Sequence, residues 1–235
     1  MRQAVLVVIA LLSAAACDSR ETTTTRLAAT GAAAPAGTAA TAAAAPAAPE
    51  GPAIPVPAIP QVSKWVLDPE NSSVGFVCKH VLSNVRGMFA QPSGTVTLDE
   101  ATPANSQISA TIDASSITTG VEERDAHLRS AEFFNVAEFP TITFVSTGVT
   151  RSGATSYTAT GDLTMHGVTK PVTLAFTASA PFEHAGGIRR GIEATTSVNR
   201  KDFGLAWEFP GEGPGVVVGD IIKVTIDAEL MLRAD

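Results

Sequence analysis

Residues 157–178, YTATGDLTMHGVTKPVTLAFTA, decide the fold. From Tyr157 to Met165, and again from Val172 to Ala178, every second residue is apolar or small, which is typical of strands with one buried face. His166-Gly167 between the two runs is a candidate two-residue turn. The segment therefore predicts an antiparallel hairpin that packs one face on a core.

The same alternation recurs on both sides of this hairpin. The further candidate strand faces are Trp65–Leu67, Val74/Phe76/Cys78, Val96/Leu98, Ile108/Ala110/Ile112, Ile142/Phe144, Ile192/Ala194/Thr196/Val198 and Ile222–Leu230. These amount to roughly eight or nine strands, so the chain is predicted to be all-β. Closing about eight of them into an antiparallel β-barrel removes exposed sheet edges, and a barrel of that size is either filled by side chains or holds one small ligand.

One segment departs from the β pattern. Thr119-Gly120-Val121-Glu122 matches the Ser/Thr-x-x-Glu capping box, and helix-prone residues follow from Glu123 to Ala131. We expect a short helix near residues 122–131 that lies on the barrel and covers one end.

The amino terminus has the pattern of a bacterial export signal. A basic start, an apolar run and small residues lead into Cys17, so residues 1–16 are predicted to be a signal peptide. Small residues before a Cys resemble a lipobox, which implies that Cys17 is acylated and anchors the chain in a membrane; ordinary cleavage is the alternative. Residues 17–61 are rich in Ala, Thr and Pro and are predicted to be a disordered tether spanning about 35 to 40 Å, followed by a barrel domain over 62–235.

Charge and motifs exclude several functions. With a formal net charge of −7, the chain lacks the excess of basic residues that is typical of nucleic-acid-binding proteins. No nucleophile elbow, phosphate loop or dinucleotide fingerprint is present, and the four histidines lack metal-ligand spacing. With Cys17 acylated, Cys78 has no partner for an intrachain disulfide and is expected to be a buried, inert thiol. We therefore expect no catalytic residue, no metal and no cofactor.

A long apolar ligand needs a dry apolar lining. The candidates are Phe76, Phe133, Phe134, Ile142, Phe144, Leu163, Phe176, Phe203 and Trp207. Strand alternation does not separate such a lining from plain core packing. Asp125 and His127, beside two arginines on the predicted helix, are candidates to meet a ligand head group at the barrel mouth; the alternative is a solvated helix surface.

Seven ordered blocks resemble the YceI-like family over about residues 64 to 232. They are Ser73–Phe76 with Lys79-His80, Val85–Phe89, Asp125–Ser130 with Phe133-Phe134, Phe139–Phe144, Gly161–Thr164 through Gly167–Val172, Asp202–Gly204 and Val218–Asp220. The resemblance implies an exported, periplasm-facing, lipocalin-like barrel that holds a polyisoprenoid or another long-chain amphiphile. It also leaves a homodimer open. The lipobox and long tether depart from the many relatives that carry a plain cleaved signal.

Three functions remain open on the sequence. The first is non-catalytic lipid binding for storage, transport or exchange at the cell envelope. The second is a structural or stress-response lipoprotein with a filled barrel. The third, an enzyme acting on a lipid head group, depends on Asp125 and His127 alone.

Overall fold

The computed structural model describes residues 57–80, 83–184, 186–208 and 218–233. The predicted signal peptide, Cys17 and nearly all of the predicted tether lie outside these ranges, so the domain boundaries stay a prediction. Within the described residues, no helix has both the length and the apolar character to cross a membrane.

The described chain forms one antiparallel sheet and one α-helix. The strands are β1 (Val62–His80), β2 (Asn84–Ala90), β3 (Ser93–Asp99), β4 (Gln107–Asp113), β5 (Ile117–Thr118), β6 (Thr141–Arg151), β7 (Ser156–Met165), β8 (Val168–Ala178), β9 (Phe182–His184), β10 (Gly187–Asn199) and β11 (Val218–Leu232). The helix is α1 (Glu122–Arg129), and short 3-10 turns occupy Pro103–Asn105, Ala114–Ser116 and Arg200–Phe203.

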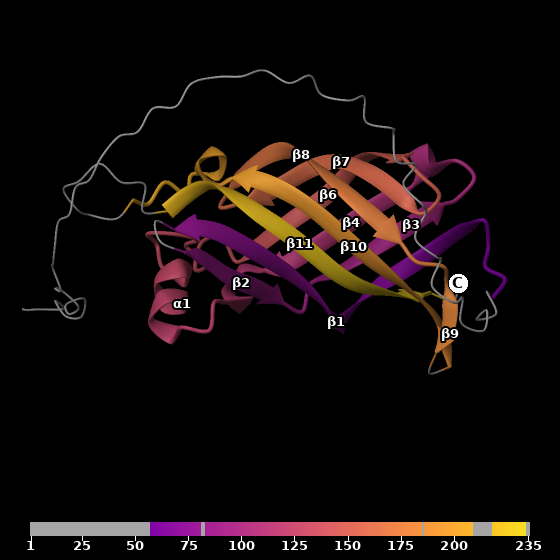
Figure 1. Cartoon of the computed structure of the whole chain (residues 1–235), viewed down its shortest axis with the longest axis horizontal. Helices are drawn as coiled ribbons and strands as arrows, with labels where there is room; N and C mark the ends of the chain where they lie inside the picture. Colours follow the sequence, from indigo (N-terminus) through magenta and orange to yellow (C-terminus); the bar gives the residue numbers. More distant parts are fainter. Residues whose placement is uncertain (1–56, 81–82, 185, 209–217, 234–235) are drawn as a thin grey trace, which may run out of the picture. The chain divides into compact units, whose positions relative to one another are not determined.

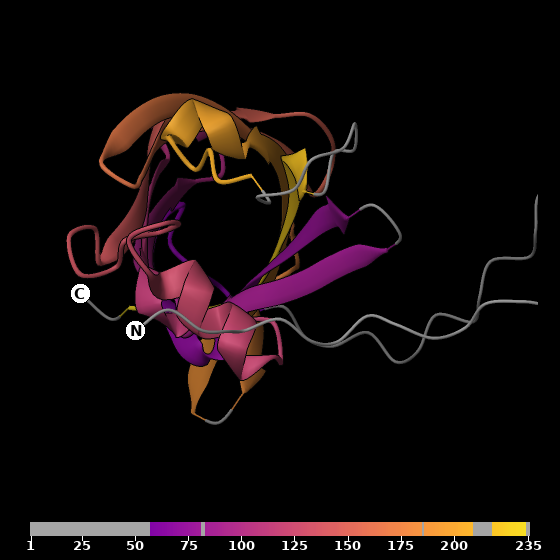
Figure 2. The same cartoon turned by 90° about the vertical axis from the view of Figure 1, so that its left-hand side faces the viewer.

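The sheet closes on itself. Its strands follow the order β11-β10-β8-β7-β6-β4-β3-β1, and β1 pairs with β11 to complete a ring of eight. β2 and β5 extend the wall beside β1, and β9 pairs with β10 outside the ring. Figure 1 shows the barrel from the side, with α1 at one end and β9 near the other, and Figure 2 looks into the α1 end. The predicted all-β, eight-stranded antiparallel barrel is confirmed.

The β7–β8 hairpin forms as predicted. Met165 pairs with Val168, which leaves His166 and Gly167 as the two turn residues with φ of 51° and 73°. Positive φ at both positions is the conformation of a type I′ turn, which matches the twist of the flanking strands. A Cβ on Gly167 would lie 2.7 Å from the Phe139 ring, so glycine is also required for close packing here.

The first strand differs from the prediction. The faces expected as two strands, around Trp65 and around Phe76, are one continuous strand, β1, whose register with β11 shifts between Asp68 and Ser73. Asp68 accepts hydrogen bonds from the backbone N–H of Glu70 and the side chain of Asn71. The turn-forming residues thus make an irregularity within a strand and do not reverse the chain.

The predicted capping box is wrong, although the helix is present. The N-cap of α1 is Val121, which makes no side-chain capping bond, and the helix ends at Arg129. The Thr119 hydroxyl instead donates to the carboxylate of Asp125 and accepts from Arg124 Nε at 2.7 Å. The Asp125 carboxylate also accepts a hydrogen bond from the backbone N–H of Thr119 at 2.8 Å. This carboxylate, one turn into the helix, therefore holds the residues that precede α1 in place.

Candidate functional site

The centre of the barrel contains an apolar cavity of about 200 Å³. Its wall comes from inward-facing residues of the eight ring strands and β2, and only Thr143 and Thr196 in that wall are polar. Four of the predicted lining residues lie here: Ile142, Phe144, Leu163 and Phe176. Small side chains at Ala110, Ala194 and Ala228 leave part of the space open; these alanines were predicted to lie on strand faces but not to line a cavity.

A second cavity of about 460 Å³ lies at the α1 end. Five predicted residues line it: Phe76, Phe133, Phe134, Trp207 and His127. Five residues, Val74, Phe89, Met165, Val198 and Val224, line both cavities. The two cavities therefore adjoin one another, with the larger one at the α1 end, and their combined volume is within the range of about 300 to 1,000 Å³ usual for ligand pockets.

Aromatic rings surround the mouth of this interior. The Phe89 ring contacts Phe76 at 5.8 Å and the edge of Phe134 at 5.7 Å between centroids. Across the cavity, the His127 ring meets Phe133 at 5.4 Å and Trp207 at 5.1 Å, both edge to face. Edge-to-face pairs favour defined ring orientations, and the rings together form an aromatic collar at the mouth.

Phe89 is the residue of this collar that strand alternation missed. It is 7% exposed and lies on β2, a strand absent from the sequence-based set. Its signal was the spacing of Val85, Gly87 and Phe89. Glycine is needed in that run because a Cβ on Gly87 would lie 2.4 Å from the Phe76 ring and 2.7 Å from the Thr118 carbonyl.

The polar side chains in this lining include a set of cationic or potentially cationic ones. The set consists of Lys79, His80, Arg124, His127 and Arg200. Of these residues, His127 was a predicted ligand contact and Arg124 is one of the two arginines beside it on α1. Lys79, His80 and Arg200 lie on other elements, far from α1 in the chain. Within the described lining residues, no aspartate or glutamate is present.

The Arg200 side chain stabilises the mouth through several hydrogen bonds. Its guanidinium is only 5% exposed and donates to the carbonyls of Leu205, Trp207 and Gly219 and to the carboxylate of Asp220. A buried guanidinium requires this degree of pairing. Arg200 thus ties the start of β11 to the segment after β10 that carries Trp207.

The two predicted head-group residues have separate positions. Asp125 is 3% exposed, accepts hydrogen bonds from Thr118 and Thr119, and does not line either cavity. Burial opposes ionisation, but the hydrogen bonds from Thr119 and Thr118 hold the pKa of Asp125 below its ordinary value. His127 does face the mouth, where its Nε2 lies 2.7 Å from a carboxylate oxygen of Glu132. Asp125 therefore secures α1, and a head-group contact remains a prediction for His127.

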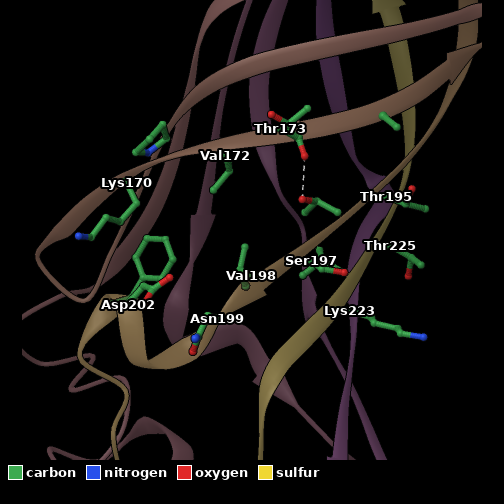
Figure 3. A pocket seen from close by; sticks show the side chains of 15 residues that line it. Lys170, Val172, Thr173, Thr195, Ser197, Val198, Asn199, Asp202, Lys223 and Thr225 are labelled. Atoms are coloured by element: carbon green, nitrogen blue, oxygen red, sulfur yellow. Dashed lines mark hydrogen bonds between the residues drawn. The ribbon is translucent and has the colours of Figure 1, made fainter.

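Phe203, also a predicted lining residue, borders neither cavity, although it belongs to the same core cluster as Val74, Phe89 and Met165. It is 2% exposed within the core and borders a pocket of about 650 Å³ between β8 and β10 (Figure 3). The ladder between these strands covers only Ile192–Thr195 against Ala175–Ala178. Beyond it, the Thr196 hydroxyl donates to the Thr173 carbonyl at 2.8 Å. The pocket and the central cavity have four lining residues in common, Val172, Thr196, Val198 and Val224. The barrel wall is therefore thin along the junction of β8 and β10, which we call the seam.

The end of the barrel away from α1 is closed. Trp65, 1% exposed, packs there with Leu98 and Leu230, and the guanidinium of Arg190 lies 5.3 Å from the centre of the Trp65 ring. Arg190 in turn pairs with Glu100 at 3.0 Å. The interior therefore narrows to a blind end, because a ring, two leucines and a paired arginine occupy it.

Cys78 lies in the wall of the mouth cavity and is half-buried, less buried than predicted. Desolvation raises the pKa of its thiol above the ordinary value, against the opposing effect of the Arg200 charge. A raised pKa keeps the thiol protonated near neutral pH. Within the described residues, no three His, Cys, Asp or Glu side chains are grouped to hold a metal ion.

A closed eight-stranded antiparallel barrel with an apolar interior, open toward one end, is the architecture of the small ligand-holding β-barrels. Residues 65–230 match the family model described as the YceI-like domain. The chain belongs to the YceI-like family, which confirms the resemblance seen in the sequence.

Relatives support the same assignment. The chain is 41% identical over 155 residues to the UPF0312 protein of Enterobacter sp. (strain 638), covering 65% of this chain and 79% of that protein. Among solved structures, it resembles Burkholderia cenocepacia BcnA with a TM-score of 0.61 and 24% identity, covering 69% of this chain and 98% of the other. It also resembles a polyisoprenoid binding domain from Saccharophagus degradans with a TM-score of 0.51 and 15% identity, covering 73% and 99%. At these identities the two structures show the fold.

Proposed function

We propose that this protein binds a long apolar lipid, a polyisoprenoid or an acyl-chain amphiphile, non-covalently inside its barrel and performs no catalysis. The observation that carries the proposal is the pair of adjoining, mainly apolar cavities inside the barrel, which have five lining residues in common. A barrel filled by side chains, the alternative considered from the sequence, requires close packing from end to end, and the two cavities argue against it.

A structural relative supports the choice of ligand class. The Saccharophagus degradans domain with the same fold is named for polyisoprenoid binding. In the present chain, branched and aromatic side chains line the interior, and they suit a flexible chain with methyl branches as well as a straight one. No side chain proposed to contact the lipid has to act as an acid, base or nucleophile.

We further propose storage, transport or exchange of this lipid at the bacterial cell envelope. Each buried CH₂ gives about 0.8 kcal/mol relative to water, so a long chain is held firmly in an aqueous compartment. A bilayer is about as apolar as the barrel, so transfer between the two is close to neutral. Export by residues 1–16, anchoring through an acylated Cys17 and a tether of about 35 to 40 Å would keep a periplasm-facing barrel within reach of the membrane.

The direct test is organic extraction of the natively purified full-length protein, followed by mass spectrometry of the extract. One prenyl or acyl lipid per barrel is the expected result. A barrel that carries no stoichiometric lipid and takes up neither prenyl nor acyl chains added in vesicles contradicts the proposal. A reaction on the head group is tested separately, since His127→Ala abolishes turnover in an enzyme but leaves the tail affinity of a binding protein largely intact.

The anchor and the assembly state need their own measurements. Cys17→Ser should release the protein from the membrane fraction into the soluble periplasmic fraction if the residue is acylated, and unchanged fractionation contradicts the anchor. Light scattering on the purified protein decides between a monomer and the homodimer that the family resemblance leaves open.

A further inference from the structure

We infer that part of the outer wall of the barrel, at the α1 end, is a docking surface for a bilayer that contains anionic lipids. This surface lies on three adjacent strands, β11, β1 and β2, and we call it the docking face (Figure 1). The inference concerns the outside of the barrel and goes beyond the proposed binding of a lipid within it. The residues of the docking face are Val77, Lys79, Arg86, Met88, Ile221 and Lys223.

The registers of the three strands place these side chains beside one another. Val77 on β1 pairs with Lys223 of β11 on one side and with Arg86 of β2 on the other. Directly opposite residues of antiparallel strands point to the same face, with Cβ atoms about 5 Å apart. Phe76 and Cys78, the neighbours of Val77 in sequence, line the mouth cavity, so Val77 and both cations point away from the interior.

Two large apolar side chains are exposed beside these cations. Ile221, two residues before Lys223 on β11, is 55% exposed, and Met88, two residues after Arg86 on β2, is 39% exposed. The residue of β1 opposite Met88 is Gly75, which has no side chain to cover it. Apolar groups interleaved with cations are typical of membrane-surface contacts, in which the apolar groups enter the interface and the cations stay at the level of the phosphates.

The cations of the docking face are available to an external partner. Among the described residues, the side chains of Lys79, Arg86 and Lys223 make no hydrogen bond and no ion pair. The acidic residue closest to them along β11 is Asp220, whose carboxylate already pairs with Arg200 at 3.3 Å and with Lys201 at 3.2 Å. The positive charge of the face is therefore not neutralised within the described part of the barrel.

The charge on the outer wall reverses sign farther from α1. Four residues after Lys223, β11 carries the exposed Asp227, and the exposed Glu193 of β10 lies directly opposite it. The chain as a whole is also acidic, with a formal net charge of −7. An anionic bilayer attracts the docking face and repels the acidic part of the wall, so it selects one orientation of the barrel.

A bilayer suits this face better than a folded protein does. The outer wall of a closed barrel is convex, and a protein partner would need a matching concave, acidic surface, whereas lipid head groups rearrange around a convex one. The mouth cavity lies at the same end, since His80, Val85 and Ile222 line it. Docking through this face therefore shortens the path of a lipid between the bilayer and the barrel.

The predicted tether is long enough for this orientation. β1 begins near the closed end of the barrel, where Ile59 packs against the cluster of Trp65, Leu98 and Leu230. The 19 residues of β1 extend over at most about 60 Å. Residues 17–61 reach up to about 150 Å when fully extended. An anchor at Cys17 and the docking face can therefore engage the same membrane.

The experiment measures sedimentation of the protein with vesicles. The full-length chain carrying Cys17→Ser is used, because an acylated Cys17 would insert into any vesicle by itself. It is titrated with vesicles of phosphatidylcholine alone or of phosphatidylcholine mixed with phosphatidylglycerol. We expect about tenfold tighter binding to the anionic vesicles at about 0.1 M salt. This difference should disappear near 1 M salt, where the Debye length is about 3 Å. Protein that only takes up a lipid molecule stays in the supernatant, so sedimentation reports docking.

Substitutions test the assignment to residues. Arg86→Gln and Lys223→Gln should each weaken binding to the anionic vesicles about fivefold, the effect of one cation near an anionic surface. Ile221→Ser should also weaken it about fivefold, through loss of the apolar contact. Lys64→Gln is the matched control, because it removes the same charge at the start of β1, near the closed end, and should leave vesicle binding unchanged. Equal melting temperatures show that the variants are folded.

Two results overturn the inference. Equal binding to neutral and anionic vesicles rejects a bilayer as the partner and favours an acidic protein surface. Anion-dependent binding that survives Arg86→Gln and Lys223→Gln together places the contact elsewhere on the chain. Extraction of the same preparations measures the lipid inside the barrel independently, so absence of that lipid contradicts the proposed function and leaves the docking result standing.

Discussion

Replacing Ala110 by Leu should shorten the lipid tail that the barrel accepts. Ala110 lies on β4 opposite Gly94 and Phe144, and its side chain borders the central cavity. Leucine adds three carbons to that space, which displace about three tail carbons. At about 0.8 kcal/mol per CH₂ the loss is about 2.4 kcal/mol, a roughly 50-fold weaker affinity for a tail that fills the wild-type cavity.

The assay is a chain-length series of fatty acids from decanoic to octadecanoic acid, measured by dye displacement in detergent-free buffer. Wild-type affinity should rise with each carbon until the interior is full and then level off. In Ala110→Leu the plateau should begin about three carbons earlier, and short chains should bind as they do to the wild type.

The matched control is Ser109→Leu, which places a leucine on the neighbouring, exposed position of the same strand. It should leave the chain-length curve unchanged. If the cavity is as open as the structure shows, Ala110→Leu also preserves or raises the melting temperature, whereas overpacking would cost about 1 to 3 kcal/mol. Identical curves for wild type and a stably folded Ala110→Leu would refute the placement of the tail.

Three further outcomes are expected. Gly167→Ala should lower the free energy of unfolding in urea by about 1 to 2 kcal/mol, because it forces a Cβ into a positive-φ turn and against Phe139. Gly187→Ala is the control: this glycine lies in open space without positive φ, so the substitution should have a much smaller effect. Hydrogen bonds from the backbone N–H of Thr102 and then from the Asn105 side chain hold the pKa of Asp99 below its ordinary value. The ionised carboxylate therefore stabilises the folded protein fully above the unfolded-state pKa of about 3.9, and this stabilisation is lost as pH falls through the lower folded-state pKa. Asp99→Asn should therefore flatten the fall in stability measured by acid titration, and an unchanged slope contradicts the assignment. Cys78 should react more slowly with iodoacetamide at pH 7 in the native protein than in urea, since burial raises its thiol pKa, and equal rates would show that it is not shielded.

Short-range patterns predicted the barrel well because strand periodicity and turn chemistry are local. The β7–β8 hairpin could be read from alternation and a His-Gly turn alone. The residues after Asp68 were misleading, because a Pro-Glu-Asn run has the composition of a turn whether it reverses a chain or only bends a strand. The pairing of β1 with β3, β2 and β11 decides between these outcomes, and those contacts are distant in sequence.

The candidate site was only partly predictable for a related reason. Nine of the eleven predicted ligand-contacting residues border one of the two cavities, but alternation could not show which inward-facing residue meets empty space and which meets another side chain. Phe203 lines the pocket between β8 and β10 together with Val198. The Asp125 carboxylate accepts a hydrogen bond from Thr119. The sequence could not predict that Arg124 and Lys79 border the same cavity, since only closure of the barrel brings α1 and the end of β1 to one opening.

The short ladder between β8 and β10 leaves part of the barrel wall without backbone pairing. A ring closed by complete ladders has a fixed circumference, because widening it breaks backbone bonds along a whole strand. Here the two strands share only four residue pairs, and a single threonine side chain spans the gap beyond them. Separation of the two strands beyond these pairs would therefore break the hydrogen bond between Thr196 and Thr173 and leave the ladder itself intact.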